Sequence, residues 1–210
     1  METLLSFDAS LFLIINSHNS PFFDHFFWIV TQLGLIWVSA PLVFAIVLKK
    51  AARKYLKNTF VFTAIASAIC LSTVTVIKVT VDRQRPVVYF EDKSISYMSY
   101  KAAAVDLPSK EKIAPIPTIH IVGSVREKYS FPSGHTAAAF TGAMILFYLF
   151  GGWFWTGFLV AALVGYSRVY VGAHFPLDVV GAMGLAVVIT WGTFFVGSRR
   201  KIIPQRGKFG

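Results

Sequence analysis

TFVFTAIASAICLSTVTVIKVTV, residues 59–81, is an apolar run long enough to cross a membrane, and it holds one charged residue, Lys78. About 20 helical residues span a hydrocarbon core of roughly 30 Å. Similar runs occupy Phe26–Leu48, Gly134–Phe150, Trp153–Tyr170 and Pro176–Val196. The chain is 55% hydrophobic and 14% charged, without the alternation of a water-soluble core. The sequence therefore predicts an all-α, polytopic membrane bundle of five transmembrane helices.

The ends and breaks of these runs define the organisation of the chain. Gly151 and Gly152 are the break between the third and fourth runs, which predicts a tight helical hairpin. Residues 1–22 hold the short apolar run Leu11–Ile15 and predict an amphipathic helix at the membrane interface, with a sixth crossing as the alternative. The first three residues lack a basic region, so we expect no cleaved signal peptide. We expect residues 1–210 to form one domain.

The net charge of +10 is concentrated in two segments, residues 49–58 and the tail 197–210. Neither contains an acid, and their cations are Lys49, Lys50, Arg53, Lys54, Lys57, Arg199, Arg200, Lys201, Arg206 and Lys208. Cytoplasmic loops are rich in Lys and Arg, so both segments are predicted to be cytoplasmic. This topology signal, with attraction to anionic lipid, explains the charge better than nucleic-acid binding does.

Counting crossings from these cytoplasmic segments places every polar cluster on the outer face of the membrane. The long loop 87–131 is then extracytoplasmic, and its apolar stretch Ile113–Val122 could lie on the membrane or roof the site. Loops of this length are more often functional than idle. Cys70 is the only cysteine, which excludes an intramolecular disulfide or a cysteine metal cluster.

The first polar cluster is Lys78 with Arg85 and Pro86. Spacing by seven puts the two cations on nearly the same face of a helix, which Pro86 is expected to end. Snorkelling of both side chains to the interface is the alternative. Arg83 points to a different face in this interpretation.

The second cluster is Pro132-Ser133-Gly134-His135, which opens the third apolar run. Ser133 suits an N-cap position, and free N–H groups in the first turn of a helix bind anions readily. His135 would lie in that first turn, close to any bound phosphate. An ordinary helix cap beside an interfacial histidine is the alternative.

The third cluster holds Arg168, His174 and Asp178. His174 and Asp178 are four residues apart, so on a helical turn the carboxylate can reach Nδ1 of the imidazole and fix its tautomer. Arg168 can bind two phosphate oxygens at once. Ionisable groups at membrane depth are expensive, which favours a functional site over a surface pair.

Together the three clusters suit transfer of a phosphoryl group. Three cations would neutralise phosphate oxygens, with backbone N–H groups near Ser133 assisting. A neutral His174 could attack phosphorus and His135 could protonate the leaving oxygen. We expect no metal and no cofactor, since no carboxylate cluster exists to hold a divalent cation.

The three motifs resemble the complete signature of the type-2 phosphatidic acid phosphatase superfamily. They are Lys78-x6-Arg85-Pro86, Pro132-Ser133-Gly134-His135 and Ser167-Arg168-x5-His174-x3-Asp178. The resemblance covers residues 59–196 and implies a metal-independent membrane phosphatase with a phosphohistidine intermediate. It implies His174 as nucleophile, Asp178 as its orienting partner and His135 as acid. The implied phosphate ligands are Lys78, Arg85, Ser133, Gly134 and Arg168.

The resemblance also bears on substrate and location. Similar bacterial proteins of the cytoplasmic membrane act on undecaprenyl pyrophosphate, phosphatidylglycerophosphate or the 1-phosphate of lipid A, and the sequence leaves all three open. A site at the outer, periplasmic face would receive a lipid phosphate from that leaflet. Two other functions remain as alternatives: a lipid phosphotransferase that uses the same intermediate, and an anion transporter with a cationic site.

Overall fold

The computed structural model describes residues 2–51, 53–91, 119–123 and 127–202, and every regular element in those ranges is helical. In chain order they are α1 (Glu2–Ser17), α2 (Pro21–Gln32), α3 (Ile36–Lys50), the 3₁₀ turn η1 (Arg53–Tyr55), α4 (Leu56–Val81), α6 (Gly134–Phe150), the 3₁₀ turn η2 (Gly152–Trp155), α7 (Thr156–Tyr170) and α8 (Pro176–Arg199). A further helical segment covers residues 86–91. The predicted all-α class is confirmed for the described residues.

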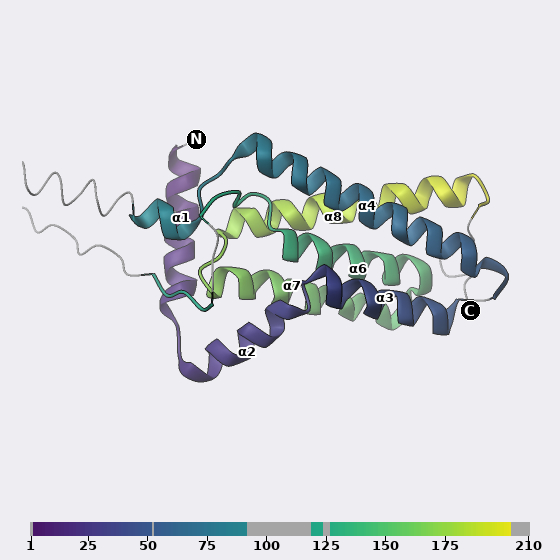
Figure 1. Cartoon of the computed structure of the whole chain (residues 1–210), viewed down its shortest axis with the longest axis horizontal. Coiled ribbons are helices and arrows are strands. Elements are labelled where there is room, and N and C mark those ends of the chain that lie inside the picture. The colour runs from purple at the N-terminus through teal and green to yellow at the C-terminus, as the bar shows by residue number, and fades with distance from the viewer. Residues whose placement is uncertain (1, 52, 92–118, 124–126, 203–210) are drawn as a thin grey trace, which may run out of the picture.

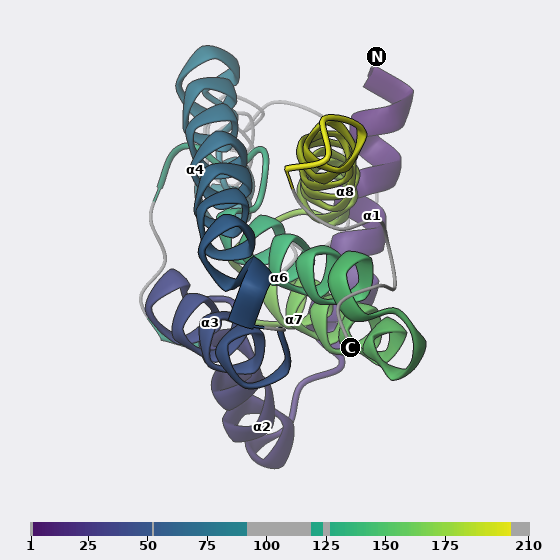
Figure 2. The ribbon, with the colours of Figure 1, turned by 90° about the vertical axis from the view of Figure 1, so that its right-hand side faces the viewer.

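Helix α6 forms the centre of the bundle and contacts α3, α4, α7 and α8 (Figures 1 and 2). Its buried residues include Ala137, Phe140 and Ile145, which lie on different faces, as expected for a helix with neighbours on most sides. Small residues let those neighbours approach closely. A Cβ atom on Gly142, for example, would lie 3.0 Å from Cγ2 of Val43 in α3.

Two helices, α8 and the one that contains α4, are long and apolar enough to span a membrane. Helices α2 and α3 meet the same criterion only when counted together as one bent span. Helix α6 has 17 residues and α7 has 15, which is short for a crossing perpendicular to the bilayer. The structure thus supports two or three spans by length and composition, and the total of five remains a prediction.

The prediction that Phe26–Leu48 forms a single helix is wrong. The segment is divided into α2 and α3, whose axes differ by 60°. Gly34 lies in the break, where a Cβ atom would be 2.8 Å from Cβ of His135 and 3.0 Å from its carbonyl oxygen. Only glycine permits so close an approach, so the bend brings the α2–α3 connection directly against the start of α6.

Lys78 and Arg85 do not share one helix face, contrary to the prediction. Helix α4 ends at Val81 because Asp82 adopts a left-handed conformation, with φ 41° and ψ 42°, and donates its N–H to the Lys78 carbonyl. Asp tolerates this conformation better than most residues. Arg85 therefore lies beyond the helix, and Pro86 begins the next helical segment rather than ending this one.

The hairpin predicted at Gly151 and Gly152 is confirmed. Both residues have positive φ, 61° and 46°, a region that glycine enters without steric cost. The turn η2 follows, and α7 returns antiparallel alongside α6 (Figure 1). This return brings Arg168, near the C-terminal end of α7, to the same end of the bundle as the first turn of α6.

Helix α1 lies across one end of the bundle (Figures 1 and 2). Asp8, Phe12 and Asn16, spaced by four, form its buried face, and the Phe12 ring packs 5.6 Å from Phe90 and 5.4 Å from Phe175. On the outer face Phe7 is 64% exposed. Sixteen residues span about 24 Å, less than a hydrocarbon core. The interfacial position of α1 remains a prediction.

Gly165 of α7 lies at the junction of α6, α7 and α8, which carry the second and third polar clusters. A Cβ atom there would lie 2.7 Å from Val179 of α8 and 3.4 Å from Thr136 of α6. We expect Gly165→Ala to force the helices apart and to lower the unfolding free energy by about 1–3 kcal/mol. Gly184→Ala on α8, where nothing lies within 4 Å, is the matched control. Thermal unfolding in detergent measures both, and equal midpoints would contradict this packing.

Candidate active site

The three polar clusters of the sequence meet at the end of the bundle that α1 crosses (Figure 1). The first comes from the last turn of α4 and the segment after it, and the second from the start of α6. The third comes from the last turn of α7, the connection that follows, and the first turn of α8. The N–H of Ser133, at the start of α6, donates to the carbonyl of Asp178 in α8 over 3.0 Å. This backbone bond joins the second cluster to the third.

His174 and Asp178 form a buried pair at the centre of the site. Nδ1 of His174 lies 3.5 Å from Oδ2 of Asp178, and the side chains are 3% and 0% exposed. His174 precedes α8 rather than belonging to it, yet the pair forms because Asp178 lies in the first helical turn. Oδ2 also accepts the N–H of Phe175 at 2.9 Å and the hydroxyl of Ser130. The carboxylate is thus held in one orientation toward the imidazole.

The surroundings of His174 favour its neutral form. Burial lowers the pKa of the imidazole well below its ordinary value, and the positive charges of Arg85 and Arg168 lower it further. Asp178 opposes this shift. A neutral imidazole whose Nδ1–H faces Asp178 keeps a lone pair on Nε2, which is the form required of a nucleophile.

The guanidinium group of Arg168 is held in place by a hydrogen bond and keeps one N–H group without a partner in the described structure. Its Nη1 donates to the hydroxyl of Thr31 in α2 at 2.7 Å. Its Nε is buried and has no hydrogen-bond partner in the described structure. Its backbone carbonyl accepts the N–H groups of Ala173 and His174 at 3.0 and 3.1 Å. A buried N–H without a partner is costly, so an oxygen of a bound anion would relieve it.

Arg85 and Lys78 line the other side of the site. Nη1 of Arg85 donates to the carbonyl of Ala173, next to His174, and Nε donates to the carbonyl of Lys128. Nζ of Lys78 donates to the carbonyl of Tyr129 at 2.8 Å. Lys78, Arg85 and Gly134 line one recess of about 330 Å³. Lys78 and Arg85 thus line the same recess although they do not share a helix face, since Arg85 lies beyond the end of α4.

His135 lies in the first turn of α6, as the sequence predicted, within electrostatic range of Arg168, Arg85 and Lys78. Ser133 occupies the N-cap position but makes no side-chain cap, since its hydroxyl accepts from Thr136 instead. The first N–H groups of a helix have no intrahelical acceptor, so this end of α6 is suited to bind an anion. All eight predicted residues therefore converge: Lys78, Arg85, Ser133, Gly134, His135, Arg168, His174 and Asp178.

The structure adds four side chains that sequence reasoning did not select. Arg83, assigned to another face, binds Asp178 at 2.7 Å and Asp8 of α1 at 2.6 Å. Ser130 and Thr31 hold Asp178 and Arg168 as described above. Asp8 alone carried a usable signal, because it is an acid within an apolar helix, where an ionisable group suggests a partner.

The described residues contain no metal site and only the last part of the predicted roof. They contain no group of three or more His, Cys, Asp or Glu side chains that could hold a metal ion. The predicted roof Ile113–Val122 falls largely outside the described residues. Its end is visible: the N–H of Val122 donates to the carbonyl of Val171, beside the site, at 3.2 Å.

Two solved structures share this fold. LpxE of Aquifex aeolicus superposes with a TM-score of 0.61 at 26% identity, over 89% of this chain and 93% of that one. A PAP2-type phosphatidylglycerolphosphate phosphatase from Bacillus subtilis superposes with a TM-score of 0.67 at 19% identity, over 95% and 88%. The second likeness, at this identity, concerns the fold alone.

Curated relatives agree with the predicted class of protein. A lipid A 4′-phosphatase of Porphyromonas gingivalis is 27% identical over 90% of this chain and 72% of its own length. An undecaprenyl-diphosphatase of Sulfolobus acidocaldarius is 53% identical over 53 residues, which is 25% of this chain and only 26% of that protein. The family model of the PAP2 superfamily matches residues 57–202. The predicted family is confirmed: this chain is a membrane protein of the PAP2 superfamily.

Proposed function

We propose that this protein hydrolyses a phosphomonoester or pyrophosphate on a membrane lipid, without a metal, through a phosphohistidine at His174. The observation that carries the proposal is the buried His174–Asp178 pair, flanked by Arg85 and Arg168. An anion of the size of phosphate would pair with the free Nε–H of Arg168 while lying next to the imidazole. Related proteins named as phosphatases support this class of activity.

The reaction has two steps. Nε2 of His174 attacks phosphorus, and the bond from phosphorus to the lipid oxygen breaks as the N–P bond forms. His135 donates its proton to that leaving oxygen. Water then attacks phosphorus as the N–P bond to His174 breaks, His135 accepts a proton from the water, and inorganic phosphate leaves. Arg168, Arg85 and Lys78 compensate the charge on the phosphoryl oxygens throughout.

The recess beside Lys78 suits a substrate that arrives from the lipid. Its aliphatic lining residues are Leu71, Val74 and Val79 of α4. Val79 is 62% exposed and Val76, one helical turn from it, is 65% exposed, as expected for a surface that faces acyl or isoprenoid chains. A lipid whose chain lies along α4 would bring its phosphate to Lys78 and Arg85.

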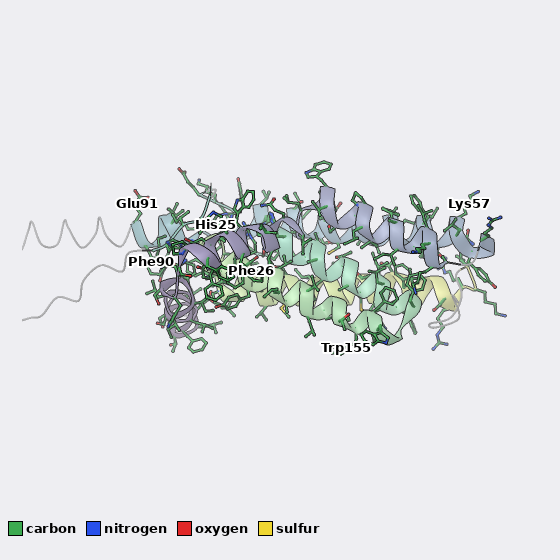
Figure 3. The ribbon with its side chains drawn as sticks, turned by 90° about the horizontal axis from the view of Figure 1, so that it is seen from below. His25, Phe26, Lys57, Phe90, Glu91 and Trp155 are labelled. Atoms are coloured by element: carbon green, nitrogen blue, oxygen red, sulfur yellow. The ribbon has the colours of Figure 1, made fainter. Side chains whose placement is uncertain are left out.

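We further propose that the site faces the periplasm or cell exterior. Lys57 lies at the far end of the bundle from Glu91 and His25 (Figure 3). Lys49, Lys50 and Arg199 are also at helix ends remote from the site. The positive-inside rule assigns that basic end to the cytoplasm of a bacterial inner membrane.

A panel of lipid phosphates tests the activity. Lipid A, undecaprenyl pyrophosphate and phosphatidylglycerophosphate, assayed on purified protein, should include a substrate that releases inorganic phosphate. Lipid A heads the panel because the relative aligned over most of the chain is a lipid A 4′-phosphatase.

Release of inorganic phosphate should persist in EDTA and be abolished in His174→Ala. Release that survives His174→Ala would contradict the mechanism. Transfer to a second lipid without release would favour a phosphotransferase, and flux in liposomes without release would favour a transporter.

Thr31 provides a test of phosphate binding by Arg168. Thr31→Val keeps the shape of the side chain but removes the hydroxyl that accepts from Nη1 of Arg168. We expect weaker inhibition by vanadate, by about tenfold, which corresponds to about 1.4 kcal/mol for one hydrogen bond. Thr31→Ser keeps the hydroxyl and is the control. Equal vanadate inhibition in all three proteins would contradict a role for this contact.

A further inference from the structure

We propose that Arg83, held by Asp8 of the N-terminal helix, is a positioning residue that orients Asp178 and preserves its negative charge for His174. The proposal rests on the nucleophilic role of His174 proposed above. It assigns α1 a part in the reaction, although no residue of α1 belongs to the three motifs.

Arg83 bridges two carboxylates with the two ends of its guanidinium group. Nη1 donates to Oδ1 of Asp178 at 2.7 Å and Nη2 donates to Oδ2 of Asp8 at 2.6 Å. The guanidinium carbon lies 4.4 Å from the ring centre of Phe175, which covers it. A planar fork can make both contacts at once, whereas the ammonium of lysine is a point charge on a flexible chain.

Asp8 is itself fixed to the start of α8. It is 1% exposed, and its second oxygen, Oδ1, accepts the N–H of Leu177 at 2.9 Å. A buried carboxylate is costly unless it is paired and hydrogen-bonded, and Asp8 is both. Helix α1 therefore contacts the helical turn that contains Asp178 through a charged, fully bonded link rather than through apolar packing alone.

Arg83 acts on the oxygen of Asp178 that does not face the nucleophile. Oδ1 binds Arg83, whereas Oδ2 faces Nδ1 of His174 and accepts from Ser130 and Phe175. Rotation of the carboxylate would break bonds on both oxygens. Arg83 thus influences His174 through Asp178, which distinguishes it from the cations that face the phosphate.

The charges explain why a second carboxylate is useful. A lone Arg83–Asp178 pair would be neutral and would stabilise a positive imidazole poorly. With Asp8 ionised, the group Asp8–Arg83–Asp178 carries one net negative charge. Phosphorylation of Nε2 makes the ring of His174 cationic, and a negative charge near Nδ1 stabilises it. Asp8 therefore balances the positive charge of Arg83, so that the negative charge of Asp178 still stabilises the cationic ring of His174.

Three single variants test this arrangement. D8N keeps an acceptor for Leu177 but removes the charge, R83K keeps the charge but not the fork, and R83Q removes both. The controls are E91Q, at an exposed acid of the same end of the bundle, and R199Q, which removes an arginine 5.1 Å from the Phe195 ring. Thermal unfolding and gel filtration of each variant report whether it folds.

A positioning role predicts a loss in kcat rather than in binding. We expect kcat to fall about tenfold in D8N and about 100-fold in R83Q, with R83K between them and both controls unchanged. KM and inhibition by vanadate should change less than about twofold, because Arg83 does not face the anion. The double variant D8N/R83Q should be no slower than R83Q, since both changes break one link.

A spectroscopic measurement keeps the test independent of turnover. In protein labelled with ¹⁵N at histidine, His174 should populate the Nδ1–H tautomer alone, and D8N and R83Q should mix the tautomers. Unchanged His174 resonances in folded D8N and R83Q, or wild-type kcat in both, would overturn the proposal.

A rise in KM or loss of vanadate binding in R83Q would instead make Arg83 a phosphate ligand. Failure of the wild-type protein on every lipid would refute the phosphatase function, while the ¹⁵N spectra would still decide the role of Arg83.

Discussion

The site depends on one buried carboxylate, that of Asp178. Its side-chain oxygens accept from Arg83, Ser130 and the N–H of Phe175, and its backbone carbonyl accepts the N–H of Ser133. Segments far apart in the chain thus meet at one residue. A buried charge is tolerated only when its bonding capacity is filled, so Asp178 constrains all of them together. The orientation of His174 follows from this constraint.

The composition and motifs alone predicted much of this arrangement. Long apolar runs indicated α4, α6, α7 and α8, and the paired glycines at 151 and 152 indicated the hairpin that returns Arg168 to the start of α6. Polar residues in apolar surroundings indicated the site, because ionisable groups at membrane depth are costly and are usually functional. All eight selected residues lie at one end of the bundle.

The errors arose where one residue changes the course of the backbone. A spacing of seven between Lys78 and Arg85 fits a continuous helix, but Asp82 ends α4 between them. An apolar run suggested one straight span, but Gly34 allows a bend against His135. Periodicity describes the faces of a helix and carries no information on such interruptions.

Contacts between distant segments were also beyond sequence reasoning. Asp8 and Arg83 are 75 residues apart in the sequence, and neither spacing nor composition pairs them. The same holds for Thr31 and Arg168. These partners belong to no motif and act through the residues that they contact. Only the packing of α1 and α2 against the end of the bundle reveals them.

Direct detection of the covalent intermediate tests the central claim most directly. Purified protein is mixed with a lipid substrate that carries ³²P in the phosphate, quenched rapidly in alkali, where phosphohistidine is stable, and digested for peptide mapping. The account predicts transient label on the peptide that contains His174, formed and lost at rates consistent with turnover. Phosphate release without any labelled protein, or label on His135 instead, would contradict it.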